Sequence, residues 1–151
     1  MNDAPIHEAP SLSHDATVAD AVHALLDSAL PALPVIDGHG ALVGLFGERE
    51  FMQALFPGYV GELGYAGFVS GELDDVLEKR AACAQEAVSA HMNTEHISVE
   101  DGFSDITLAE VFLHHRVLVL PVERDGRPIG VVIRSDFFRR LAETFLERRA
   151  R

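Results

Sequence analysis

The sequence has a single cysteine, Cys83, and no long apolar run. One cysteine excludes an intramolecular disulfide, so the chain fits a reducing compartment and we expect a cytoplasmic protein. No run approaches the roughly 20 apolar residues that a membrane-spanning helix needs. The first ten residues are acidic and lack the charged-then-apolar pattern of an export signal. These absences argue against a disulfide-stapled secreted domain and against a membrane protein.

Basic residues are also scarce. Acidic residues outnumber them 24 to 12, which gives a formal net charge of −12. Such a charge opposes approach to nucleic acid and to anionic membranes, so we expect neither as a partner. Nine of the twelve basic residues lie at or after Arg116. An anionic small ligand is therefore expected in the second half, although a helix C-terminus is enough to explain Arg148, Arg149 and Arg151.

Residues 117–138 predict a β-hairpin that leads directly into a helix. Two β-branched runs, Val117–Val122 and Ile129–Ile133, flank the turn-forming residues Arg124–Arg127. Ser135 and Asp136 then precede large apolar residues at helical spacing. A helix start presents unpaired N–H groups and a positive dipole end. Phosphate or a sugar hydroxyl could be held at this junction.

The same helix, strand, strand, helix pattern occurs twice. Pro34 and Pro121 lie 87 residues apart, whereas Gly44 and Gly130 lie 86 apart, because the second hairpin turn is one residue shorter. Two fixed offsets in the same order indicate an internal duplication.

Short motifs mark both copies. They are Thr17-Val18, Leu33-Pro34-Val35 and Leu42-Val43-Gly44 in the first copy, and Val88–Met92, Ile97-Ser98-Val99, Leu120-Pro121-Val122 and Ile129–Val132 in the second. In this order and spacing the copies resemble a tandem pair of cystathionine-β-synthase (CBS) domains, often called a Bateman module. The resemblance implies an α/β (α+β) fold with two β-α-β-β-α repeats, a pseudo-twofold axis and clefts between the repeats.

The resemblance also gives the domain boundaries. We expect a first repeat at 1–56, an insert at 57–87 and a second repeat at 88–151, joined in one compact module. The insert predicts one helix, Glu72–Ala84, with acidic residues first and basic residues later. Its apolar residues are expected to pack on the body of the protein; they are Tyr59, Val60, Leu63, Tyr65 and Phe68.

Modules of this family are regulatory sensors rather than enzymes, commonly bind adenine nucleotides or related adenosyl ligands, and usually form homodimers. The resemblance therefore implies a non-catalytic module that requires no cofactor and binds AMP, ADP, ATP or S-adenosylmethionine as a regulatory ligand. It implies a homodimer that signals to an effector protein whose identity is unknown. Two alternatives remain open: a ligand-free homodimerisation scaffold, and an acidic adaptor that docks a basic partner through residues 72–78.

The family's ribose and phosphate signature is Gly, two apolar residues, Ser or Thr, two variable residues and Asp. The second repeat matches it from Gly130 to Asp136, with Ile133 in place of the hydroxyl residue. A carboxylate can accept hydrogen bonds from both ribose hydroxyls, and an arginine can pair with phosphate. The predicted second-repeat site is Gly130, Ile133, Arg134, Ser135 and Asp136, with His96, Ile97, Val119, Leu120 and Pro121 as an apolar slot for adenine. Without a ligand, Asp136 would be a helix N-terminal acid and Arg134 a solvated charge.

The first repeat departs further from the signature. Gly47 replaces the hydroxyl residue and Glu50 replaces the aspartate. The weaker first-repeat site comprises Gly47, Arg49, Glu50, Leu33 and Pro34.

The sequence gives little support for a metal site or for an enzyme active site. The adjacent His114 and His115 would point about 100° apart on a helix, and no paired cysteines accompany them, so we expect no metal site. The chain has no Gly-x-Ser-x-Gly elbow and no phosphate-binding Gly-rich loop followed by Lys and Ser or Thr. We therefore expect no catalytic residues.

Overall fold

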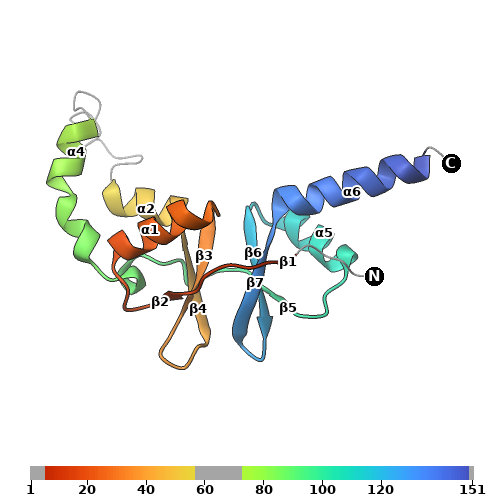
Figure 1. The fold of residues 1–151 in the computed structure, drawn as a ribbon, viewed down its shortest axis with the longest axis horizontal. Helices are drawn as coiled ribbons and strands as arrows, with labels where there is room; N and C mark the ends of the chain where they lie inside the picture. Colours follow the sequence, from red (N-terminus) through yellow and green to blue (C-terminus); the bar gives the residue numbers. More distant parts are fainter. Residues whose placement is uncertain (1–5, 57–72, 150–151) are drawn as a thin grey trace.

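The computed structural model describes residues 6–56 and 73–149 (Figure 1). The repeated β-α-β-β-α order is confirmed. The first repeat comprises β2 (Leu12–Ser13), α1 (Val18–Ser28), β3 (Ala32–Ile36), β4 (Leu42–Gly47) and α2 (Glu48–Leu55). The second comprises β5 (Val99–Glu100), α5 (Asp105–His114), β6 (Val119–Arg124), β7 (Arg127–Ile133) and α6 (Arg134–Arg149). The remaining elements are β1 (Ile6–His7), α4 (Leu73–Lys79) and two 3-10 helices, η1 (Ala81–Gln85) and η2 (Val88–Ala90).

Each repeat builds its own sheet, and the lead-in segment of each repeat crosses to the sheet of the other. The sheets have the strand orders β2-β3-β4 and β1-β7-β6-β5, so β1 belongs to the second repeat's sheet. There Ile6 pairs with Val132. In return, Asn93 exchanges backbone hydrogen bonds of 2.8 and 3.0 Å with Leu45 of β4. This reciprocal exchange follows the pseudo-twofold relation between the repeats.

The two crossings explain the repeated glycines. A Cβ atom on Gly130 would lie 2.8 Å from the carbonyl oxygen of His7, and one on Gly44 would lie 2.8 Å from Sδ of Met92. Real Cβ atoms essentially never approach a neighbour so closely. Both glycines are therefore needed because a crossing segment lies directly over each hairpin.

The main hydrophobic core spans the seam between the repeats. Leu33, Val35 and Phe46 of the first repeat cluster with Val119 and Val131 of the second, and all five are almost fully buried. Burying a side chain of this size contributes roughly 1.5 to 3 kcal/mol. A second core lies within the second repeat, between its sheet and its helices; its buried members are Val99, Leu108, Leu120, Val122, Val132 and Phe137. The two repeats therefore fold as one packed body.

Helices α1 and α5 begin with side-chain caps, and the turn predicted at Arg124–Arg127 is present. Thr17 caps α1 with a capping box, in which the Asp20 N–H donates to Thr17 Oγ1 over 3.1 Å. Ser104 caps α5 without a capping box: its Oγ accepts the Thr107 N–H over 3.1 Å. The second hairpin closes with Asp125 and Gly126 at φ values of 55° and 80°. Two central residues with positive φ are typical of a type I′ turn, which matches the twist of paired strands.

The single helix predicted for Glu72–Ala84 is wrong. The chain forms α4 over Leu73–Lys79 and then the separate 3-10 helix η1. The break lies where the insert meets α2: the guanidinium of Arg80 donates to the carbonyl oxygen of Ala54 over 2.7 Å, and Cys83 is buried in the same cluster. Contact with α2 thus overrides the continuous helical pattern. The expected packing of Tyr59–Phe68 concerns residues outside those described.

Candidate functional site

The junction between hairpin and helix is built identically in both repeats. The Glu48 N–H donates to the Pro31 carbonyl over 2.9 Å, and the Arg134 N–H donates to the Leu118 carbonyl over the same distance. The first N–H of each helix is therefore satisfied within the protein. The bonds fix the first turns of α2 and α6 beside the residues that precede β3 and β6.

A cavity of about 300 Å³ opens at the first-repeat junction. Side chains from both repeats line it, because the segment around Asn93 crosses onto β4 and the residues before β6 lie opposite α2. The first repeat contributes Pro31, Ala32, Leu45, Glu48, Arg49, Glu50 and Met52, and the second contributes Asn93, Arg116, Val117, Leu118 and Val119.

Arg49 and Arg116 bring positive charge to this cavity, which the acidic Glu48 and Glu50 also line. The two guanidinium groups come from different repeats, and both side chains are exposed. Neither forms an ion pair with any acidic residue in the described part of the chain. Glu50 is only 8% exposed, and its Oε1 accepts the Gly47 N–H over 2.8 Å. One oxygen of the Glu50 carboxylate is thus engaged in capping α2, while the two arginines remain available to an anion.

The predicted first-repeat site is only partly assembled. Arg49 and Glu50 line the cavity. Leu33 and Pro34 do not line the cavity, and both side chains are fully buried in the core. Gly47 has no room for a side chain: an added Cβ would lie 2.3 Å from the Pro31 carbonyl oxygen.

Asp136 occupies in the second repeat the position of Glu50 in the first. Its side chain is half-buried and has no hydrogen bond or ion pair with another residue in the described ranges. Arg134 and Ser135 are exposed and line a different depression, which lies between α5 and α6. The carboxylate of Asp136 is therefore free to accept hydrogen bonds, unlike that of Glu50.

The apolar slot predicted beside Asp136 is not formed as a unit. Leu120 and Pro121 are fully buried, and Ile97 packs on the second core. Val119 instead lines the first-repeat cavity. The side chain of His96 is half-buried, and its Nδ1 has no hydrogen-bond partner in the described ranges. These residues therefore face different parts of the molecule: Ile97 and Leu120 belong to the second core, and Val119 to the seam between the repeats.

Two other predicted residues have packing roles. Gly130 lies beneath the crossing strand β1, and Ile133 packs against the core at the seam. Asn93 and Arg116, by contrast, line the cavity although the motifs did not single them out. The available signal for Arg116 was its place directly before β6, at the start of the basic half of the chain. Nothing local marks Asn93, because its position depends on the crossing.

The described ranges, 6–56 and 73–149, also bear on metal binding and on membrane insertion. There, no three His, Cys, Asp or Glu side chains gather closely enough to hold a metal ion. No helix within those ranges combines the length and apolar character needed to cross a bilayer.

Comparisons with known proteins agree on one relationship. The family model described as CBS domain matches residues 1–57 and 88–143. A CBS domain-containing protein of Dictyostelium discoideum is 28% identical over 127 residues, which cover 83% of this chain and 79% of that protein. A CBS domain-containing protein of unknown function from Kribbella flavida superposes with a TM-score of 0.71 at 19% identity, covering 91% of this chain and 95% of that one.

A further solved structure in the same comparison contains a ligand. CBSX2, described as a CBS-pair protein from Arabidopsis thaliana, was solved in complex with AMP. That complex superposes with a TM-score of 0.65 at 21% identity and covers 92% of this chain and 93% of that one. At such identities the similarity establishes the fold alone.

Proposed function

The chain belongs to the CBS domain family, and from this premise we propose that it is a cytoplasmic, non-catalytic regulatory module that binds an adenosine-type nucleotide between its repeats. One observation carries the proposal: the 300 Å³ cavity at the seam presents two arginines without acidic partners in the described ranges, one from each repeat. In a chain of net charge −12, arginines that form no ion pair within the described ranges favour an anionic ligand.

The lining suits the parts of a nucleotide. Guanidinium groups pair with phosphate oxygens in a forked geometry, so Arg49 and Arg116 are assigned to the phosphate. Apolar side chains before β6, Val117 and Leu118, offer a surface for the adenine ring, and the Asn93 amide can both donate and accept hydrogen bonds. AMP bound to the fold-related CBSX2 makes the adenosine class the first to test.

Asp136 is assigned to a second, weaker position on the α6 side of the pseudo-twofold axis. Its carboxylate is uncommitted, and a carboxylate can accept hydrogen bonds from both ribose hydroxyls. The first-repeat counterpart, Glu50, already accepts the Gly47 N–H. The two junctions therefore differ in what they offer: arginines without ion pairs in the described ranges at the first, and an uncommitted carboxylate at the second.

Ligand binding can become a signal because the two arginines belong to different repeats. A phosphate held by both guanidinium groups binds more tightly to the arrangement of repeats that brings them together. A ligand shifts a conformational equilibrium only through such a difference in affinity. The altered orientation of the repeats would then be sensed by an effector protein.

Isothermal titration calorimetry against AMP, ADP, ATP and S-adenosylmethionine tests the proposal. We expect saturable binding of at least one ligand, and Arg116→Ala should weaken it about tenfold, the effect of losing one charged hydrogen bond. Arg127→Ala is the matched control, since it removes the same charge from the exposed hairpin turn outside the cavity.

The Asp136→Ala variant distinguishes binding in the first-repeat cavity from binding beside Asp136. If this variant loses affinity while Arg116→Ala does not, the ligand binds on the α6 side. Absence of heat with all four ligands would refute nucleotide binding and leave the scaffold function. The exposed apolar residues of α6 favour that second candidate, which predicts self-association independent of any nucleotide.

A further inference from the structure

The residue that opens the helix after each hairpin has opposite charge in the two repeats. Glu48 opens α2 and Arg134 opens α6. The two positions correspond, because each backbone N–H donates to the carbonyl oxygen of a residue just before the neighbouring strand. Glu48 is exposed, lines the first-repeat cavity and forms no ion pair within the described ranges. An uncompensated acid therefore lies in the same cavity as the arginines assigned to phosphate.

The charges of the lining suit a ligand with one phosphate group. Among the described residues that line the cavity, Arg49 and Arg116 are basic, whereas Glu48 and Glu50 are acidic. A phosphate monoester carries about −1.5 to −2 charges at neutral pH, so a single group is enough to compensate both guanidinium groups. A second or third phosphate would find no further basic side chain in the described lining and would share the cavity with Glu48.

The size of the cavity points in the same direction. Its volume is about 300 Å³. Small-molecule sites in proteins span roughly 300 to 1,000 Å³, so this cavity lies at the lower end of that range. Among the adenine nucleotides, a small site favours AMP, which has the fewest phosphate groups.

We propose that Glu48 is a specificity-determining residue that restricts the first-repeat cavity to a nucleotide with a single phosphate group. The inference rests on the proposed nucleotide-binding function and adds which member of that class the cavity accepts. Glu48 repels the additional phosphates of ADP and ATP, while Arg49 and Arg116 bind the one phosphate of AMP. Discrimination of this kind depends on a repulsive element that acts against the wrong ligand.

Isothermal titration calorimetry with AMP and ATP tests the role of Glu48. Divalent cations are left out of the buffer, because they would neutralise the additional phosphates. The wild-type chain should bind AMP at least about tenfold more tightly than ATP. Glu48→Gln should narrow this ratio about fivefold, the scale of one contact between like charges in water. Glu48→Arg, which introduces the residue type of the second repeat, should narrow it further.

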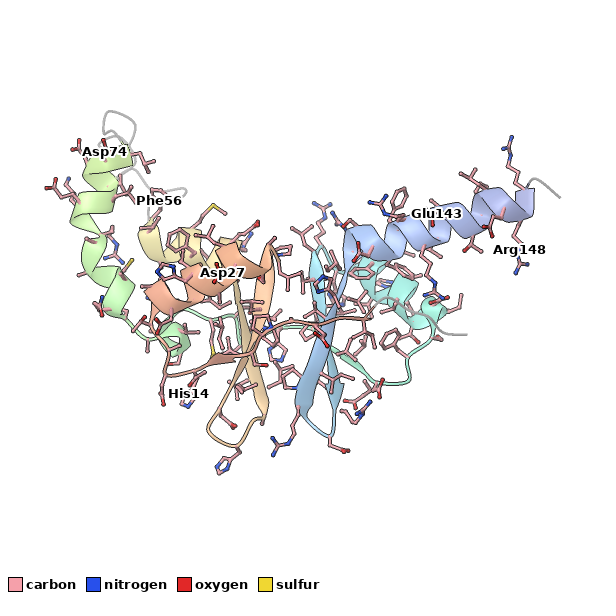
Figure 2. The ribbon with its side chains drawn as sticks, in the orientation of Figure 1. His14, Asp27, Phe56, Asp74, Glu143 and Arg148 are labelled. Carbon is pink, nitrogen blue, oxygen red and sulfur yellow. The ribbon has the colours of Figure 1, made fainter. Side chains whose placement is uncertain are left out.

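Glu143→Gln is the matched control. Glu143 is an exposed acid on α6 that does not line the cavity, and Figure 2 shows it along that helix, away from the first repeat. Its substitution removes the same charge and should leave the ratio of AMP to ATP affinity unchanged. An acid at a helix start also interacts favourably with the helix dipole. Loss of that interaction alone would lower stability without changing the ratio, so the ratio separates the two roles.

The possible outcomes distinguish this inference from the proposed function. A wild-type chain that binds ATP as tightly as AMP overturns the role of Glu48 and leaves nucleotide binding intact. So does a Glu48→Gln protein that is folded by circular dichroism and keeps the wild-type ratio. If neither nucleotide nor ADP produces heat with the wild-type chain, the proposed adenine nucleotide site fails and the role of Glu48 fails with it.

Discussion

The helices that follow the two hairpins begin alike and end differently. Each starts with the same backbone hydrogen bond to the residue before the neighbouring strand, yet α2 has 8 residues and α6 has 16. Arg80 of the insert binds the Ala54 carbonyl near the end of α2, and Leu55 is 8% exposed there. Leu141, the residue of α6 that corresponds to Leu55, is 43% exposed. The insert thus covers the helix that follows the hairpin in the first repeat, whereas the corresponding part of α6 in the second repeat is exposed.

The acids at the start of these helices show the same divergence. Glu50 has one methylene more than Asp136, and its carboxylate turns back to accept the Gly47 N–H. No described residue donates to Asp136. A position that the family signature assigns to ligand binding is therefore used for helix capping in the first repeat.

The largest expected effect comes from making the first junction resemble the family signature. Gly47→Ser restores the missing hydroxyl, but its Cβ would lie 2.3 Å from the Pro31 carbonyl oxygen. We expect the variant to lose about 2 to 3 kcal/mol of unfolding free energy, a typical penalty for overpacking. Urea unfolding followed by circular dichroism measures the change. The second repeat tolerates Ile133 at this position, so the constraint is particular to the first.

Gly38→Ser provides the matched control for this substitution. A Cβ on Gly38 meets nothing within 4 Å, so its unfolding free energy should change by no more than about 0.5 kcal/mol. Equal stability of the Gly47→Ser and Gly38→Ser proteins would contradict the close packing described for the junction.

An intermediate loss of stability is expected from removing the arginines that hold α2 and α6 to their neighbours. Arg80 donates to Ala54 from both Nε and Nη2, whereas Arg140 makes a partly exposed ion pair with Asp105. Arg80→Ala should cost about 1 to 2 kcal/mol, and Arg140→Ala about 0.5 to 1 kcal/mol, because exposed ion pairs contribute little. Urea unfolding of both variants orders the two contacts. Added salt should reduce the loss of unfolding free energy more in Arg140→Ala than in Arg80→Ala. A larger loss in Arg140→Ala than in Arg80→Ala would show that the insert does not secure α2.

The smallest expected effect is a pH-dependent change in stability at the first hairpin turn, which the second turn does not share. Hydrogen bonds from the Ala41 and His39 N–H groups to the Asp37 carboxylate lower its pKa below the usual value. A lowered folded-state pKa stabilises the fold above the ordinary pKa, about 3.9, and this contribution disappears as pH falls through the folded value. The stability difference between wild type and Asp37→Ala should therefore shrink below about pH 4.

Urea midpoints at neutral and acidic pH measure this difference. The second turn supplies the control, because Asp125 adopts a φ of 55° that asparagine also tolerates. Asp125→Asn should leave the neutral-pH midpoint nearly unchanged. A difference for Asp37→Ala that grows on acidification would contradict the assignment of these hydrogen bonds.

Local patterns in the sequence determined most of the fold. The hairpin strands, the Thr17 and Ser104 caps and the two-residue turn at Asp125 follow from alternation, capping and turn chemistry among near neighbours, and the offsets of 87 and 86 residues revealed the duplication. Such signals are readable because each depends on only a few adjacent residues. The assignment of Arg49 and Glu50 to a ligand site came instead from the resemblance to the CBS family signature.

Tertiary structure alone decided which residues share the first-repeat cavity. Ile97 stays with the second core, whereas the segment before it crosses between the repeats and places Asn93 on β4. Tertiary structure also decided that Glu50 caps α2 and that Arg80 breaks the predicted insert helix. Each outcome depends on contacts between segments distant in sequence, where packing and backbone pairing outweigh local preference.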